Sequence, residues 1–94
     1  MENKDVYKIY TKIVDKFSAI AVAYENGLET EDKLKKNACS HIGTLTRLKE
    51  VDNLAVDDLI EEFTAIIKAE KTTLNTAIEK ICDTLYTRIH SVKE

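Results

Sequence analysis

An apolar stripe through the C-terminal part of the chain restricts how this sequence can fold. If each residue turns a helix by about 100°, a set of apolar side chains falls within about 40° of Val56. These side chains are Ile60, Phe63, Ile67, Leu74, Ile78, Ile81, Leu85 and Val92. The stripe keeps its phase, and the stretch contains neither Gly nor Pro, the strongest helix breakers. The pattern therefore predicts helix over most of Asn53–Val92.

Two interpretations of this stretch lead to different molecules. The unbroken phase favours one continuous or merely kinked helix about 60 Å long, which the rest of a 94-residue chain is too short to cover. The other interpretation breaks the helix between Glu70 and Asn75. There the stripe lapses for one turn, and Thr72 and Thr73 are poor helix formers. The break would give a self-contained four-helix bundle.

The long helix would expose its apolar stripe, and an exposed stripe of this size calls for a second chain. We therefore expect a homo-oligomer, most simply a two-fold dimer. Its interface is predicted at Ile67, Leu74, Ile78, Ile81 and Leu85.

The first half of the chain predicts an antiparallel pair of helices. A stripe with helical spacing runs from about Lys4 to Asn26, and Gly27 can end this helix in the left-handed conformation. Thr30 is placed to cap a second helix, which should end near Glu50. We expect an all-α fold, a small antiparallel helical bundle in one domain over residues 1–94, with three helices or, if the last one breaks, four.

Composition narrows the classes of protein that fit. Apolar residues make up 44% of the chain and charged residues 33%, which is typical of globular helical proteins and not of disordered ones. No apolar run approaches the roughly 18 residues of a membrane span, and the N-terminal residues do not resemble a signal peptide. Cys39 and Cys82 lie on different predicted helices, and a disulfide framework in a small secreted protein usually needs more than two cysteines. We therefore expect reduced thiols and a cytoplasmic protein without membrane association.

Residues that could carry catalysis or bind a metal do not form a known pattern. His41 lies within the apolar stripe of the second helix, where a lone His is more often a hydrogen-bonded core or interface residue than a catalyst. Metal sites in helical bundles need converging ligands, such as a Glu followed three residues later by a His, and no Glu of this sequence has a His at that spacing. Cys39 and His41 point in different directions on a helix, so they do not form a nucleophile and base pair. We expect no enzymatic activity, no metal and no cofactor.

Gly43 interrupts the second helix on the side opposite its stripe. If the helix broke there, residues 39–43 would form the turn of a helix-turn-helix motif, with 44–49 as its recognition helix. The later apolar positions Leu45, Leu48 and Val51 continue the earlier stripe, which favours an unbroken helix.

The charges are unevenly distributed, although the net charge is only −3. One face of the first helix carries a row of lysines four residues apart: Lys4, Lys8, Lys12 and Lys16. Residues 33–49 contain basic and no acidic side chains, and residues 50–62 contain the reverse. Antiparallel packing would let the two blocks neutralise each other.

The sequence favours a non-enzymatic protein that binds another protein, as an adaptor, chaperone or inhibitor does. An uncharged section over 17–24 and the basic outer face of the second helix suggest the surface, with Tyr7, Val22, Lys36 and Arg47 as its candidate residues. The alternative is an anionic ligand, a nucleotide or nucleic acid, bound by the basic faces of the first two helices.

Overall fold

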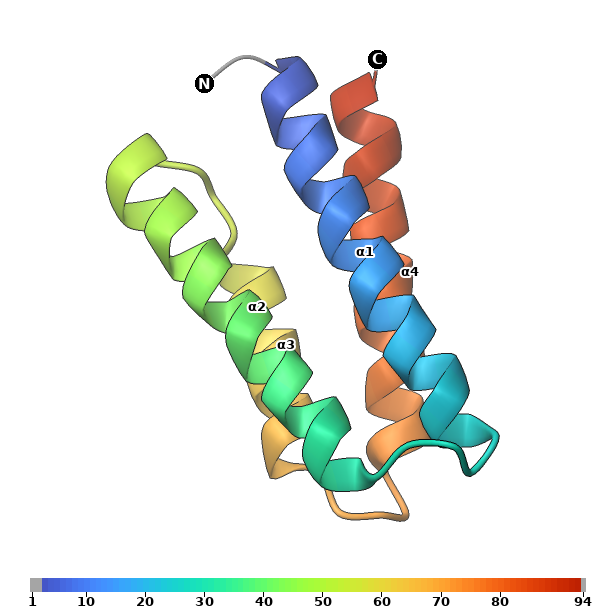
Figure 1. Ribbon diagram of the computed structural model, residues 1–94. Coiled ribbons are helices and arrows are strands. Elements are labelled where there is room, and N and C mark those ends of the chain that lie inside the picture. Colours follow the sequence, from blue (N-terminus) through green and yellow to red (C-terminus); the bar gives the residue numbers. More distant parts are fainter. Residues whose placement is uncertain (1–2, 94) are drawn as a thin grey trace.

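Four antiparallel helices make up residues 3–93, the part of the chain that this computed structural model describes (Figure 1). They are α1 (Asn3–Glu25), α2 (Glu31–Asp52), α3 (Asp57–Lys68) and α4 (Leu74–Lys93). Helix α1 packs on α2 and α4, and α3 packs on the same two helices, so the helices form a ring around one core. The all-helical prediction is confirmed, and the version with four helices is the correct one.

Local residues explain the helix ends on either side of the first turn. Gly27 takes a φ of 74°, and the Leu28 N–H donates to the carbonyl of Ala23 over 2.8 Å, which closes α1. The Thr30 hydroxyl accepts from the Lys33 N–H over 3.2 Å and caps α2, as predicted. Helix α2 continues to Asp52, beyond the predicted end at Glu50, because Asn53 takes the left-handed conformation that ends it.

The C-terminal stretch is broken, so the continuous-helix interpretation is wrong. Helix α3 ends at Lys68, and Ala69 is extended with φ −66° and ψ 143°. The Thr73 N–H and hydroxyl both donate to the Glu70 carbonyl, over 3.0 and 3.2 Å. Lys35 of α2 donates to the Ala69 carbonyl over 2.9 Å and holds the turn against the bundle. The break lets α4 fold back along α1.

The apolar stripe is consequently covered by the chain itself. The predicted oligomer interface residues Leu74, Ile81 and Leu85 are fully buried within the single chain, and Ile78 is 3% exposed. Ile67 is half-buried and packs against the same core. Because α4 folds back along α1, it buries most of the apolar surface that a second chain was expected to cover, and this surface no longer favours a homo-oligomer. The oligomeric state stays a prediction.

Helix α2 runs without interruption through Gly43, so the helix-turn-helix interpretation is wrong. A Cβ atom built on Gly43 meets nothing within 4 Å, which places this glycine on an open face. Within residues 3–93, no helix has both the length and the apolar character required to cross a lipid bilayer.

Candidate functional site

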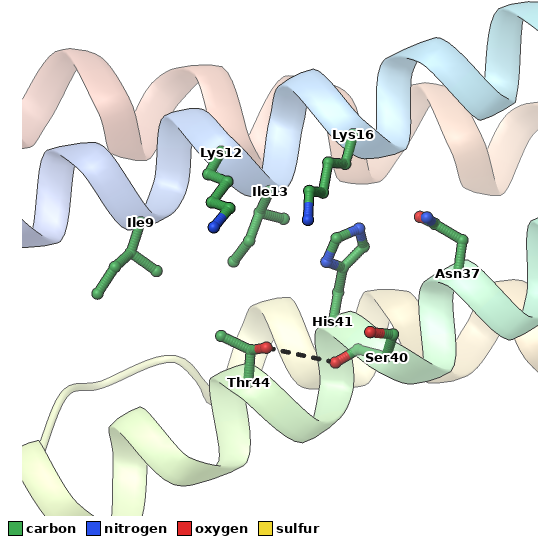
Figure 2. A pocket seen from close by; sticks show the side chains of 8 residues that line it. All are labelled: Ile9, Lys12, Ile13, Lys16, Asn37, Ser40, His41 and Thr44. Atoms are coloured by element: carbon green, nitrogen blue, oxygen red, sulfur yellow. Dashed lines mark hydrogen bonds between the residues drawn. The ribbon is translucent and has the colours of Figure 1, made fainter.

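A pocket with one basic wall lies between α1 and α2 (Figure 2). Its volume is about 350 Å³, within the range of small-molecule sites. Helix α1 contributes Ile9, Lys12, Ile13 and Lys16, and α2 contributes Asn37, Ser40, His41 and Thr44. Because the helices are antiparallel, Ile9 and Thr44 lie toward one end, and Lys16 and Asn37 toward the other.

His41 is the buried polar residue at the inner side of this pocket. It is 6% exposed, and its ring lies against Phe17 of α1 and Phe63 of α3, with centroids 6.3 and 5.5 Å away. Its Nε2 atom is shielded from solvent and has no hydrogen-bond partner. The sequence predicted a hydrogen-bonded core histidine; the structure places the ring in the core but leaves Nε2 unpaired.

The surroundings of His41 favour its neutral form. Burial among apolar side chains lowers the pKa of the imidazole below 6.5, and the positive charge of Lys16 lowers it further. Both effects favour the uncharged imidazole at neutral pH. The charge at the pocket then comes from the lysines.

Lys12 and Lys16 supply a positive rim one helical turn apart. Both are exposed, and in Figure 2 both side chains extend from α1 into the space beside His41. Within residues 3–93, no acidic side chain forms an ion pair with either of them; the lysines that pair with carboxylates include Lys33, Lys35 and Lys49. The positive potential at this rim is thus not neutralised by a partner.

The remaining polar groups lie on α2. The Asn37 Oδ1 atom is shielded from solvent and, like His41 Nε2, has no hydrogen-bond partner. The Thr44 hydroxyl donates to the Ser40 carbonyl of its own helix over 3.4 Å. Buried polar atoms usually find partners, so two unpaired atoms in one small region need an explanation.

The residues predicted to bind a partner do not gather on one surface. Val22 is 55% exposed and lines a groove between α1 and α4, whereas Lys36 and Arg47 are exposed on α2 and do not line that groove. Tyr7 is half-buried and packs against the core. Their role in binding stays a prediction.

The groove between α1 and α4 is mainly apolar and acidic. Ala21 and Ile78 are buried in it, Val22 and Tyr86 are exposed, and its charged residues are all acidic. These are Glu25, Glu79 and Asp83. Cys82 also lines the groove, and burial raises the pKa of its thiol, which disfavours the reactive thiolate.

Sequence reasoning missed Asn37 and Thr44 as pocket residues and did not name Ser40 as a site residue. It placed the lysine row, which includes Lys12 and Lys16, on a basic face that could bind an anionic ligand, but it did not connect these two lysines with His41. The lysine row and the lone histidine in an apolar stripe were both visible. Nothing in the sequence indicated that Lys16 and His41, 25 residues apart, would face each other, because that depends on how α1 packs on α2.

Within residues 3–93, no three His, Cys, Asp or Glu side chains come together as metal ligands, and both cysteines are free. No family model, curated protein or solved structure matches this chain.

Proposed function

We propose that this protein binds a small anionic ligand in the pocket between α1 and α2. The observation that carries the proposal is the unpaired Nε2 of buried His41 beside two lysines without acidic partners. A buried polar atom without a partner destabilises a fold by about 1–3 kcal/mol, so an incoming ligand that pairs it gains affinity. This is the anionic-ligand alternative drawn from the sequence, now restricted to a small molecule by a volume of about 350 Å³.

The groups of the pocket suit an oxyanion. A lysine ammonium donates up to three hydrogen bonds, and two lysines at this spacing can share one carboxylate or phosphate. The neutral imidazole donates from Nε2 when the proton is on that nitrogen, and the Asn37 amide presents NH2 donors after a half-turn about its terminal bond.

The test is a titration at low ionic strength with sodium hexanoate and with inorganic phosphate, followed by amide shifts in NMR spectra. We expect shifts centred on residues 12–16 and 37–44, and we expect affinity to fall steeply as salt is added. Lys16→Gln should weaken binding by about tenfold.

Lys8→Gln is the matched control, because Lys8 is an exposed lysine of the same row that does not line the pocket. It should bind as the wild type does. The proposal is overturned if neither anion shifts pocket residues, or if both lysine variants weaken binding equally.

Protein binding, the function favoured by the sequence, is a second candidate at a different surface. Val22 and Tyr86, 55% and 50% exposed, lie together in the acidic groove between α1 and α4. Exposed apolar side chains within a polar rim are typical of docking sites. Of the residues predicted to bind a partner, Val22 lines this groove, whereas Lys36 and Arg47 do not.

A photo-crosslinking amino acid at position 86 tests the second candidate in cells. We expect a discrete crosslinked partner from position 86 and none from position 51, since Val51 is 73% exposed but does not line the groove. Equal products from both positions would show nonspecific contact and reject the groove.

A further inference from the structure

The two ends of the pocket between α1 and α2 differ in polarity. Lys16, His41 and Asn37 lie toward one end, and Ile9 lies at the other. Between them Ile13 forms an apolar wall that is 3% exposed, and Lys12 sits above it (Figure 2). A simple inorganic anion would use only the polar end and leave the half-buried Ile9 without a contact.

We infer that the ligand of this pocket is amphipathic, with an oxyanion head at Lys12 and Lys16 and a short apolar tail along Ile13 and Ile9. The inference rests on the proposed function and adds the chemical class of the ligand. The shared chemistry is a carboxylate or phosphate monoester on a short hydrocarbon chain.

The head is assigned to the end where unpaired polar atoms and positive charge coincide. His41 Nε2 is shielded from solvent and has no hydrogen-bond partner. Lys16 is exposed, so its side chain is free to shift and admit an oxygen of the ligand. The same oxyanion then receives donors from both helices, which ties the ligand to the interface between them.

The tail length follows from the helix geometry. Seven residues separate Ile9 from Lys16, which is about 10 Å along the axis of α1. A head group and roughly six carbon atoms span that distance, since each C–C bond is about 1.5 Å long. Thr44 of α2 lies beside the tail end and adds one methyl group to its wall.

Straight-chain carboxylates of increasing length test the tail. Acetate, butyrate and hexanoate are titrated into the full chain, and dissociation constants are taken from the NMR shifts. Each buried methylene strengthens binding by up to about fourfold, so hexanoate should bind at least tenfold more tightly than acetate. Inorganic phosphate and hexyl phosphate form a parallel pair that distinguishes the two head groups.

Two variants locate the tail. Ile9→Gln should abolish the advantage of hexanoate over acetate. Thr44→Val should increase that advantage, because it replaces a hydroxyl of the wall by a methyl group of similar size. Ile9 is half-buried, so the polar substitution could prevent folding. Thr44 is exposed, so Thr44→Val still tests the placement of the tail in that case.

The outcomes separate this inference from the proposed function. Equal binding of acetate and hexanoate, with both weakened by Lys16→Gln, would overturn the amphipathic ligand and leave the anion site in place. If hexanoate still binds more tightly than acetate to Ile9→Gln, and if Thr44→Val does not change this difference, the placement of the tail is overturned. If no anion binds, the proposed function itself is lost.

Discussion

At the scale of single residues, His41 shows a conflict between a side chain and its surroundings. Its ring packs well against Phe17 and Phe63, yet Nε2 is buried without a partner. A residue that served only the core would be expected to be apolar here. The conflict is resolved if Nε2 of His41 binds a ligand. Removal of this atom should then stabilise the ligand-free protein and weaken ligand binding.

We expect His41→Phe to raise the free energy of unfolding of the ligand-free protein by about 1 kcal/mol, because it removes an unpaired buried polar atom and keeps the ring contacts. The adjacent pocket leaves room for the larger ring. Urea unfolding at pH 7 measures the change, and the hexanoate titration should show weaker binding by the same variant. A loss of stability would contradict the assignment of Nε2 as unpaired.

The same histidine predicts a pH dependence of stability. Its pKa in the folded chain is below 6.5 because of burial and the charge of Lys16, while the other aromatic residues packed on it, Phe17 and Phe63, carry no charge. As the pH falls through about 6.5, the unfolded chain takes up the proton first, so the folded chain loses stability. Above that pH the histidine has no such effect.

Urea unfolding of wild type and His41→Phe at several pH values between 8 and 5 isolates this contribution. The stability gap between the two proteins should widen as the pH falls below about 6.5. Parallel curves over this range would show that His41 does not titrate differently in the folded and unfolded chains.

The two glycines give a matched pair of predictions. Gly43→Ala should stabilise the chain by about 0.5–1 kcal/mol, because alanine is the better helix former and its Cβ meets nothing within 4 Å. Gly27→Ala should destabilise it by about 1 kcal/mol, since the φ of 74° disfavours a side chain. Thermal unfolding of both variants measures the opposite signs. Destabilisation by Gly43→Ala would indicate that this open face is covered in solution.

At the scale of helices, one arginine joins α4 to the start of α3. Arg88 donates to the Ala55 carbonyl over 2.7 Å and also pairs with Asp58. The same Oδ1 atom of Asp58 accepts from the Leu59 N–H over 2.9 Å, which satisfies one donor in the first turn of α3. The N-cap residue Val56 makes no side-chain hydrogen bond, so these contacts hold that helix end.

Arg88→Ala should therefore lower the free energy of unfolding by about 1–2 kcal/mol, since it removes hydrogen bonds that link two elements. Arg47→Ala is the control, because Arg47 is exposed on α2 and should change stability by less than about 0.5 kcal/mol. Denaturant unfolding compares the two. Equal small effects would mean that water replaces the Arg88 contacts at no net loss.

At the scale of the whole molecule, the chain buries its long stripe without help. The radius of gyration is 13.0 Å, close to the roughly 12 Å expected for a compact chain of this length. The exposed large apolar side chains, Val22, Leu28, Val51 and Tyr86, are distributed over α1, α2, α4 and the first turn.

We therefore predict a monomer of 10.7 kDa by light scattering coupled to chromatography at tens of micromolar protein. This replaces the homo-oligomer expected from the continuous helix. A stable dimer would contradict the prediction. The groove of Val22 and Tyr86 would then be the candidate interface, because four of the five residues first assigned to an interface are buried within the single chain and Ile67 is half-buried.

The sequence by itself determined what depends on neighbours along the chain. The periodic stripes predicted helices, Thr30 and Gly27 marked helix ends, and most stripe residues became core, because propensity, capping and amphipathicity act over a few residues. Only the tertiary structure decided the break at 69–73, where the advantage of packing α4 on α1 lies far from the turn in sequence. It alone also brought Lys16 to His41, since a pocket between two helices depends on how they pack and not on either helix alone.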